Sequence, residues 1–364
     1  MTASNLEQLS GKRILVTGHT GFKGAWLTIW LCALGAEVTG YSLEPEHPNG
    51  VFALSGVQRS IQHIVGDIRD AEALHAAFFE SRPDAVLHLA AQPLVLRAYR
   101  DPRYTYDVNV MGTLNVLEEL RQSDKCRAGI IITSDKCYEN REWVYGYRET
   151  DRLGGSDIYS SSKGCCELLA HAWRHTYLPT EDIAAHGKLL ITARAGNVLG
   201  GGDWAADRIV PDCVRSLSAG ETITLRRPQS VRPWQHVLDP LMGYLLLAAR
   251  ALEGNTAVSG AWNFGPDPSG LVTVEHLVQK LIAAWGGGNY TCNPDASQVP
   301  ETSLLNLDSG KARHFLGWRP VWGVDDTVQK TVEWYKNYAS SNVLALCLSQ
   351  IGEYMRSGNK DLKP

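Results

Sequence analysis

The chain has 364 residues, of which 44% are hydrophobic and 20% are charged, and its formal net charge is −4 at pH 7. These values are typical of a soluble globular protein with a sizeable core, in one large or two closely joined domains. They exclude a general electrostatic attraction to nucleic acid or to an anionic membrane surface.

The sequence also argues against membrane insertion, export and metal binding. The longest apolar stretch near the start, AWLTIWLCALGA, is too short to span a bilayer. The segment MTASNLEQLSGKR lacks the apolar region of a secretory signal, so we expect a cytoplasmic protein. Eight scattered cysteines form no C-x-x-C pair and have no histidines at metal-ligand spacing, so we expect reduced thiols and no metal.

Strands and helices alternate along the first half of the chain. Short β-rich apolar runs predict strands at 13–18, 37–43, 61–68, 84–91, up to Thr133, and at 189–196. Helices are expected at 23–35, 70–81, roughly 103–123, and from about Tyr159 onward. This alternation predicts right-handed crossovers and a parallel sheet covered on both faces, an α/β fold of the doubly wound Rossmann type.

The alternation weakens after residue 197. GGGDWAADRIVPD predicts a loop that enters a helix, TITLRR (222–227) predicts a strand, and a helix at 239–252 with AWNFGP returns to the α/β pattern. A last helix is expected near 325–337. We therefore predict a larger domain at 1–196 plus about 232–263, and a smaller mixed α/β lobe at about 197–231 plus 264–364. Ligands of open α/β sheets bind beyond the carboxyl ends of the strands, where such a lobe would close over them.

A glycine-rich turn, TGHTGFKG, follows the first strand and opens the first helix. In a dinucleotide site, the first glycine permits the tight turn and the second lets backbone N–H groups approach a pyrophosphate. The third lets helix and strand pack closely. Gly18, Gly21 and Gly24 fill these positions. The strand–turn–helix context favours a dinucleotide site over a merely tight βα turn.

The end of the second strand favours NAD over NADP. Residues 41–48 contain no Arg or Lys that could meet a 2′-phosphate, and Glu44 and Glu46 would repel one. Tyr41 and Ser42 stand where a ribose-binding acid is often found. We therefore expect NAD.

A Ser, a Tyr and a Lys suited to hydride transfer follow. Ser134 ends a strand, and Tyr159 and Lys163 lie one helical turn apart. A tyrosine base active near neutrality needs its pKa lowered by roughly 3 units, which is about 4 kcal/mol of phenolate stabilisation. Lys163 and an oxidised nicotinamide would provide positive charge, and Ser134 can hydrogen-bond the same substrate hydroxyl. Together the three residues make a base for alcohol oxidation.

Two further titratable groups, Asp135 and Lys136, directly follow Ser134. Hydride transfer alone has no use for them, whereas eliminating water needs an acid and a base. Oxidising a sugar at C4 makes the C5 proton acidic, so a base at C5 and an acid at the C6 hydroxyl can expel water before the hydride returns to C6. We assign Asp135 as the general acid and Lys136 as the base, or the enolate stabiliser, at C5. The alternative is a surface ion pair, which would contribute little.

These motifs resemble the extended short-chain dehydrogenase/reductase family. The G-x-x-G-x-x-G spacing and the Tyr159-x-x-x-Lys163 pair carry the resemblance to the superfamily. The runs TSDKCYENREW, GNVLGGGDWAADRIVPD and RPWQHVLDPL are similar to those of the sugar-nucleotide 4,6-dehydratases, and among these to the branch that acts on CDP-glucose. Lys136 stands where the dehydratases of dTDP-sugars have a glutamate base.

The resemblance implies NAD as cofactor and a nucleotide sugar as substrate. The cofactor-binding residues that it implies are Gly18, His19, Gly21, Phe22, Lys23, Gly24, Asp67, Ile68, Leu89, Ala90, Ala91, Gln92, Asn109, Tyr159 and Lys163. The substrate-binding residues that it implies are Ser134, Asn197, Arg208, Ile209 and Arg232. The planar fork of an arginine suits the oxygens of a diphosphate. The choice of nucleobase rests on the resemblance alone.

The resemblance further implies a homodimer, or a tetramer, paired through helix 103–123 and the helix that carries Tyr159. Val110, Leu114 and Leu117 form an apolar stripe there, although a core helix shows the same stripe. A cytoplasmic role in making deoxysugars for surface polysaccharide, such as the lipopolysaccharide O-antigen, is also implied. The alternatives are a dehydratase of UDP-N-acetylglucosamine or dTDP-glucose, an epimerase, and a non-catalytic NAD-binding regulator.

Overall fold

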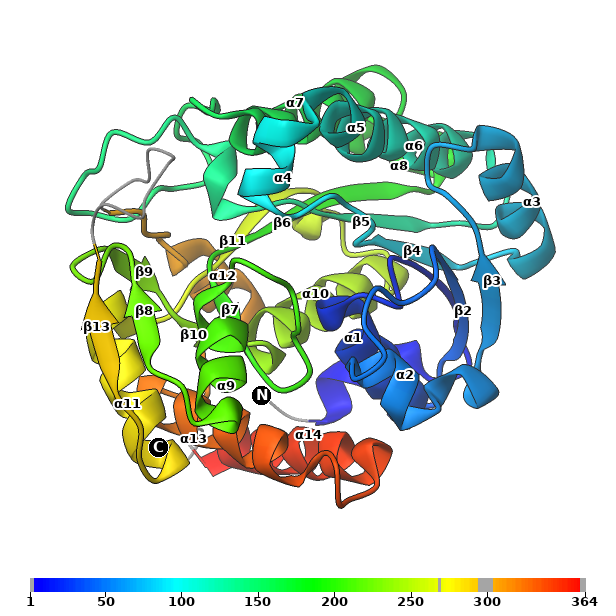
Figure 1. Cartoon of the computed structure of the whole chain (residues 1–364). Coiled ribbons are helices and arrows are strands. Elements are labelled where there is room, and N and C mark those ends of the chain that lie inside the picture. The colour runs from blue at the N-terminus through cyan, green and yellow to red at the C-terminus, as the bar shows by residue number, and fades with distance from the viewer. Residues whose placement is uncertain (1–2, 268–269, 294–303, 361–364) are drawn as a thin grey trace.

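The computed structural model describes residues 3–267, 270–293 and 304–360, and it confirms the α/β fold. Its centre is a parallel seven-stranded sheet in the order β11-β6-β5-β4-β1-β2-β3 (Figure 1). The strands are β1 (Arg13–Thr17), β2 (Glu37–Ser42), β3 (Gln62–Val65), β4 (Ala85–His88), β5 (Ala128–Ile132), β6 (Leu189–Ala195) and β11 (Gly260–Phe264). The strand order reverses between β1 and β4, and an open α/β sheet binds its ligand at such a point.

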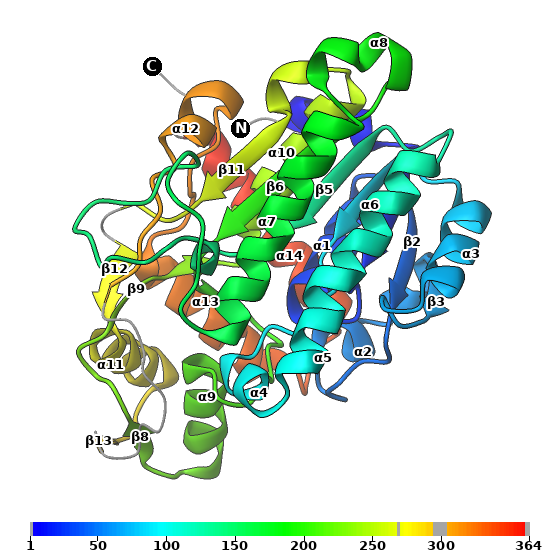
Figure 2. The ribbon, with the colours of Figure 1, turned by 90° about the horizontal axis from the view of Figure 1, so that it is seen from above.

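Helices cover both faces of this sheet, as the alternating pattern predicts. One face carries α3 (Ala71–Ser81), α6 (Gly112–Gln122) and α7 (Ile158–Thr176), and Figure 2 shows α6 and α7 lying across the strands. The other face carries α1 (Phe22–Ala33) and α10 (Leu238–Leu252). β5 and β6 are buried along their whole length because both faces are covered, which explains the continuous apolar sequence of β5 and the largely apolar sequence of β6.

The helix expected at 103–123 is present with an irregular middle. It begins as α5 (Pro102–Tyr106), passes through a π-helical turn at Asp107–Met111, and continues as α6. A π-helical turn places one extra residue in a helix and is found often at functional sites. Asn109 lies in this turn.

The lobe, in the ranges that the structure describes, combines helices with small two-stranded sheets. The helices that line or support it are α9 (Ile209–Ala219), α11 (Val274–Trp285) and α13 (Val324–Asn337). The strand pairs are β8 (Ile223–Leu225) with β13 (Tyr290–Cys292), β9 (Val231–Pro233) with β12 (Leu271–Thr273), and β7 (Val198–Leu199) with β10 (Gln235–His236). The elements expected after 208, at 222–227, at 239–252 and near 325–337 are therefore present. α11, α12 (Gly310–Leu316) and α14 (Val343–Lys360) were not predicted.

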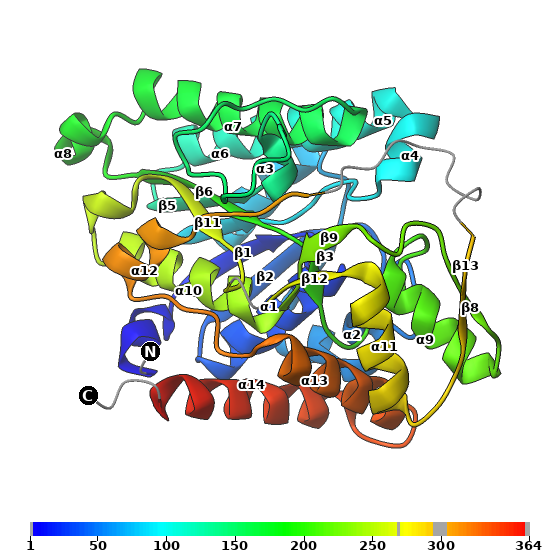
Figure 3. The same cartoon turned by 90° about the vertical axis from the view of Figure 1, so that its left-hand side faces the viewer.

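α14 packs on two helices from the first part of the chain. In Figure 3 it runs along the lower edge of the molecule, and its contacts are with α1 and α2 (Val51–Ser55). The rings of Trp30 and Tyr354 meet edge to face at 5.7 Å, and the Tyr354 hydroxyl donates to Asp239 at 2.8 Å. The division into two domains stays a prediction, and its segment 264–364 includes 268–269, 294–303 and 361–364, which lie outside the described residues.

Three further findings concern membranes, thiols and metals. None of the helices in the described part of the chain is long and apolar enough to cross a membrane. The eight cysteines are free thiols. Within the described ranges, no group of three or more His, Cys, Asp and Glu side chains is arranged to hold a metal ion.

Candidate active site

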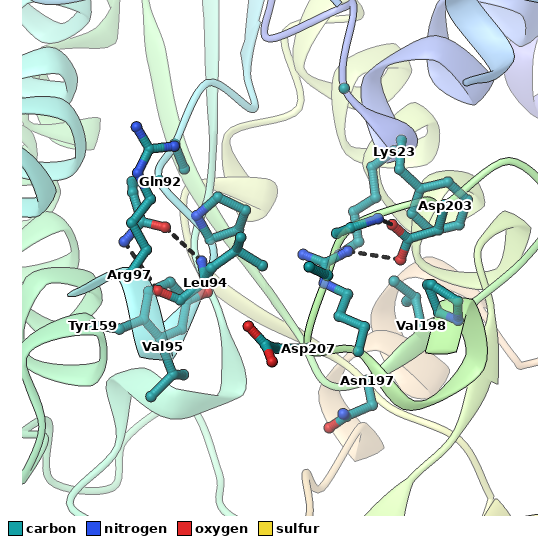
Figure 4. Close-up of a pocket in the computed structure, with 18 of the residues that line it drawn as sticks. Lys23, Gln92, Leu94, Val95, Arg97, Tyr159, Asn197, Val198, Asp203 and Asp207 are labelled. Atoms are coloured by element: carbon teal, nitrogen blue, oxygen red, sulfur yellow. Dashed lines mark hydrogen bonds and ion pairs between the residues drawn. The ribbon is translucent and has the colours of Figure 1, made fainter. Parts of the chain in front are cut away.

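A cavity of about 1880 Å³ opens where the carboxyl ends of the strands face the lobe (Figure 4). The glycine turn, the segments after β4, β5 and β6, and the start of α9 line it. Predicted site residues in its lining are Gly18, Gly21, Phe22, Lys23, Gly24, Asp67, Ile68, Leu89, Ala90, Ala91, Gln92, Ser134, Asp135, Lys136, Tyr159, Lys163, Asn197, Arg208, Ile209 and Arg232. The cavity therefore brings together nearly all the residues that the sequence singled out, while His19 and Asn109 do not line it.

Two glycines of the glycine turn, Gly18 and Gly24, leave no space for a side chain. Gly18 has φ 75°, and a Cβ there would lie 2.6 Å from the backbone nitrogen of Ala90. A Cβ on Gly24 would lie 2.1 Å from the Gly18 carbonyl oxygen. Gly21 is the N-cap of α1, whose first turn has no side-chain cap and faces the cavity. Free N–H groups at a helix N-terminus bind phosphate, so this turn fits the pyrophosphate of a dinucleotide.

His19 points away from the cavity. Its Nε2 lies 2.7 Å from Nδ1 of His63, and its ring occupies the space that a Cβ on Gly40 would need. Burial lowers the pKa of His19 to about 3, so the ring is neutral. The side chain of His19 packs against Gly40 in β2, so only the backbone of His19 could contact a cofactor.

Asn109 lies behind the cavity wall and hydrogen-bonds two of the segments that form it. Its side-chain oxygen accepts from the Gln92 backbone at 2.8 Å, and its amide nitrogen donates to the Ser162 hydroxyl at 2.9 Å. The amide therefore joins the segment after β4 to α7, and it is buried away from the cavity surface. The π-helical turn aims this side chain inward, a direction that sequence reasoning did not foresee.

An aromatic ring flanked by two arginines forms one end of the cavity. Asp67 binds Arg69 at 2.6 Å, and this hydrogen bond holds the pKa of the Asp67 carboxyl below its usual value. Tyr104 lies under both Arg69 and Arg97, at 4.9 and 4.6 Å from its ring centroid. Arg97 also approaches Glu46 at 3.6 Å. Sequence reasoning missed Tyr104 and Arg97, because only tertiary packing brings them to Asp67.

The Ser134–Lys136 segment forms a short 3₁₀ turn at the end of β5. The Ser134 hydroxyl donates to Oδ1 of Asp135 at 2.8 Å and accepts from the Lys136 backbone N–H at 3.2 Å. The second carboxylate oxygen of Asp135 is buried and has no hydrogen-bond partner among the described residues. Burial raises the pKa of Asp135, with Lys136 the largest opposing influence. A carboxyl of this kind keeps its proton to higher pH than usual, as a general acid requires.

Tyr159 reaches the same point from α7. Burial raises the pKa of its phenol to about 12, although a hydrogen bond with Ser134 and the charge of Arg208 act to lower it. Lys163 donates to the Ile132 carbonyl at 3.4 Å, and burial lowers its own pKa. The expected lowering of the phenol pKa is therefore absent in the protein alone, because burial outweighs the hydrogen bond with Ser134 and the charge of Arg208.

Two cations face the reacting groups from the opposite wall. Lys23, in the first turn of α1, lies 3.5 Å from the Tyr244 hydroxyl, and burial and the neighbouring Arg208 lower its pKa to about 8. Arg208 is paired with Asp203 at 2.8 Å. Figure 4 shows Lys23 and Asp203 on one wall, and Gln92 and Tyr159 on the other. Asp203 lies in the GGGDWA run, which the sequence had marked without giving this acid a role.

The lobe adds aromatic and basic side chains. Trp204 stacks on His47 at 5.1 Å and donates to the Asn49 carbonyl at 2.7 Å, so it joins the lobe to the loop after β2. Trp234 is buried and donates to the Val272 carbonyl at 3.1 Å. Three arginines that sequence reasoning missed also line the cavity: Arg215, Arg226 and Arg227. The run TITLRR was the only signal for the last two.

The fold, the glycine turn and the Ser134–Tyr159–Lys163 group are typical of dinucleotide-dependent enzymes of the short-chain dehydrogenase/reductase class. Residues 15–331 match the family model of GDP-mannose 4,6 dehydratase, and the chain belongs to this family. It is 44% identical over 346 residues to a CDP-glucose 4,6-dehydratase of Salmonella typhimurium, a match that covers 95% of this chain and 96% of the relative. The resemblance to sugar-nucleotide dehydratases is thereby confirmed.

More distant relatives share the same fold. dTDP-glucose 4,6-dehydratase 1 of Escherichia coli is 25% identical, over 89% of this chain and 92% of that protein. UDP-glucose 4-epimerase of Thermus thermophilus, solved in complex with NAD, has a TM-score of 0.75 at 25% identity, covering 89% and 99% of the two chains. The dTDP-glucose 4,6-dehydratase DesIV of Streptomyces venezuelae, also solved with NAD, has a TM-score of 0.75 at 24% identity, covering 89% and 97%.

Proposed function

We propose that this protein is an NAD-dependent CDP-glucose 4,6-dehydratase, which converts CDP-D-glucose into CDP-4-dehydro-6-deoxy-D-glucose and water. The observation that carries the proposal is the buried carboxyl of Asp135, beside Ser134 and in one cavity with Tyr159 and Lys163. Its pKa is raised, which an elimination acid needs and a simple dehydrogenase does not. The 44% identity to a CDP-glucose 4,6-dehydratase supports the choice of substrate.

The glycine turn would hold the cofactor. The backbone at Gly21 and Phe22 would bind the pyrophosphate, and Leu89, Ala90 and Ala91 would lie along the dinucleotide. Bound NAD⁺ supplies a hydride acceptor and a positive charge, which favours the phenolate form of Tyr159.

The first step is oxidation of the sugar at C4. Tyr159 takes the proton of the C4 hydroxyl while the hydride leaves C4, and Ser134 hydrogen-bonds the same oxygen. Lys163 stabilises the phenolate form of Tyr159 from the next turn of α7. The product of this step is a ketone at C4 with an acidic proton at C5.

The second step is elimination of water across C5 and C6. Lys136 accepts the C5 proton or stabilises the enolate that its removal leaves. Asp135 gives its proton to the C6 oxygen, which departs as water. The cofactor held by the glycine turn would supply the hydride that C6 receives, and with a proton added at C5 the sugar ends as a 4-keto-6-deoxy sugar.

The nucleotide part of the substrate would lie on the lobe. Arg232 would bind the diphosphate, and Arg208 and Ile209 would lie near the nucleotide. Asn197 would contact the phosphate or the sugar. We also propose that the segments 197–231 and 264–364 form the substrate-binding lobe, apart from α14.

The wider setting follows from the family. We propose a homodimer, or a tetramer, that pairs through α5–α6 and α7. Tyr99, Met111 and Leu168 support this assignment, since they are 45%, 46% and 58% exposed on these helices and on α4 (Val95–Arg100). A cytoplasmic role in making deoxysugars for surface polysaccharide, such as the O-antigen, completes the proposal. Light scattering on the purified protein measures the number of subunits.

Mass spectrometry of the products tests the activity. The protein is incubated with substoichiometric NAD and, separately, with CDP-glucose, dTDP-glucose and UDP-N-acetylglucosamine. We expect loss of one water from CDP-glucose over many turnovers per NAD. Water loss from another sugar nucleotide would keep the mechanism and overturn the substrate, whereas no mass change would favour an epimerase or a non-catalytic protein.

A further inference from the structure

A buried ion pair lies directly behind the reacting residues. Glu167 on α7 and Arg194 on β6 have side chains only 2% and 3% exposed. Two bonds join them, from Nη2 of Arg194 at 2.7 Å and from its Nε at 2.9 Å. Neither residue lines the cavity, so the pair does not contact the ligands. A buried pair of charges is weak support for stability, which leaves its presence to be explained in another way.

The ion pair is hydrogen-bonded to both ends of the segment 133–138, which contains the reacting residues. The Thr133 hydroxyl, directly before Ser134, donates to Oε1 of Glu167 at 2.5 Å. The Tyr138 hydroxyl, directly after Cys137, accepts from Nη1 of Arg194 at 2.6 Å. The residues between these two anchors include Asp135 and Lys136, the acid and the base of the proposed elimination.

The same pair is attached to the other reacting group. Glu167 lies one helical turn after Lys163, which itself lies one turn after Tyr159. Glu167 is therefore fixed to the helix that carries the oxidation residues, while its carboxylate holds the segment that carries the elimination residues. Arg194 lies in β6, so the ion pair also joins these two segments to the strand that precedes Asn197.

We propose that Glu167 and Arg194 are positioning residues that fix the elimination segment relative to the oxidation helix. This inference rests on the proposed function, because only a reaction with both steps needs the two sets of groups in register on one sugar ring. Proton transfers at C4, C5 and C6 without release of the ketone require each group to be held within a fraction of an ångström. A charged, fully bonded anchor holds such geometry better than an apolar contact.

Two threonines provide a matched test. Thr133 and Thr192 each donate one hydrogen bond to the Glu167 carboxylate, at 2.5 and 2.8 Å, and both are buried. Only Thr133 adjoins the reacting segment, since Thr192 lies within β6. Thr133→Val should lower kcat about 10-fold with KM unchanged within about twofold, and Thr192→Val should leave kcat within about twofold of the wild type.

Two further variants complete the series. Thr133→Ser keeps the hydroxyl and should restore kcat. Tyr138→Phe removes the bond from Arg194 and should lower kcat as Thr133→Val does. Thermal melting of each variant reports the loss of stability, which should be similar for the two Thr→Val changes. Equal kcat losses in both Thr→Val variants, or no loss in either, would overturn the proposal.

Hydrogen exchange separates this proposal from the proposed function. Backbone exchange of residues 133–140 is measured without any substrate, and it should be faster in Thr133→Val than in the wild type or Thr192→Val. If the wild type does not dehydrate CDP-glucose but the exchange difference is present, the anchor is supported and the proposed substrate is wrong. If exchange is unchanged in Thr133→Val, the anchor is refuted whatever the substrate.

Discussion

The two halves of the cavity are built in opposite ways. In the half that we propose for the dinucleotide, the glycine turn consists of closely packed backbone, where Gly18 and Gly24 leave no space for even a Cβ. The nucleotide-sugar half consists of charged side chains in ion pairs, such as Arg208 with Asp203 and Arg215 with Asp212. An added side-chain atom should therefore weaken NAD binding in the first half. A removed charge should weaken binding of the nucleotide sugar in the second half.

The largest effect is expected where the two halves meet, at Asp135. Asp135→Asn keeps the oxygen that accepts from Ser134 but has no proton to give, so elimination should slow by about 10³-fold. Oxidation at C4 should continue, and reduced cofactor should accumulate in a single turnover. Absorbance of the reduced cofactor measures oxidation, and water loss by mass spectrometry measures elimination. Parallel loss of both steps would contradict the assigned role.

Asp135 should also leave a mark on the pH profile. Its raised pKa keeps the acid protonated to higher pH than a free aspartate, and elimination should fall as pH rises through that pKa. The descending limb of kcat should disappear in Asp135→Asn. If the descending limb is still present in Asp135→Asn, it is caused by another titrating group.

The next effect concerns the packed backbone of the dinucleotide half. Gly24→Ala would force a Cβ against the Gly18 carbonyl oxygen, so NAD affinity should fall about 100-fold as the turn shifts. Gly323→Ala is the control, since Gly323 stands at the start of α13 but has open space around it. Titration of NAD against protein fluorescence measures both. Unchanged affinity in Gly24→Ala would mean that the turn does not bind the pyrophosphate.

A smaller effect is expected from removing charge in the lobe. Arg208→Met and Arg232→Met should each raise KM for the nucleotide sugar about 10-fold and leave NAD affinity within about twofold. Arg250→Met removes a surface arginine paired with Glu253 at 2.9 Å and serves as the control. Initial rates over a range of substrate concentrations supply KM. A loss of NAD affinity in either variant would show that the arginines of the lobe also serve the cofactor, contrary to the division into two halves.

The last effect concerns the stability of the fold and involves Lys23, which comes from the half around the glycine turn and faces the other half. Its pKa of about 8 lies below the ordinary 10.5, so between these values the folded protein binds fewer protons than the unfolded chain. The free energy of unfolding should therefore rise with pH across this window. Lys23→Met should be more stable by up to about 3 kcal/mol at pH 7, since one pKa unit corresponds to about 1.4 kcal/mol, and it should lack this rise.

Urea unfolding at pH 7 and pH 10 measures both predictions for Lys23. Lys125→Met removes an exposed lysine and controls for the loss of a positive charge. Equal stability of wild type and Lys23→Met at pH 7 would show that the Lys23 ammonium is well solvated.

Local motifs explain which parts of the site could be predicted from the sequence. The glycine turn and the Tyr159–Lys163 pair depend on neighbours within one strand, turn or helix, and the structure has them in one cavity. The inward direction of Asn109 depends on a π-helical turn, and that of His19 depends on the absence of a side chain at Gly40. Neither condition is visible in the local sequence around these two residues.

Long-range packing explains what the sequence left out. Tyr104 meets Arg97 and Arg69 only in the folded chain, and the same holds for the electrostatic effect of Arg208 on Lys23. α14 was missed for the same reason. Its place is set by Tyr354, which bonds Asp239 from 115 positions away.

The packing of α14 on α1 has a consequence for how the protein is made. α1 contains Trp26 and Trp30, which are fully buried in the finished structure, and the Trp30 ring meets Tyr354. A ribosome completes α1 some 300 residues before Tyr354 leaves the exit tunnel, a delay of roughly 15–60 s at usual rates of synthesis. During that interval the apolar surface of α1 that packs on α14 is exposed to solvent. We therefore expect nascent chains cut before residue 343 to bind chaperones through α1, and chains that include α14 to be released.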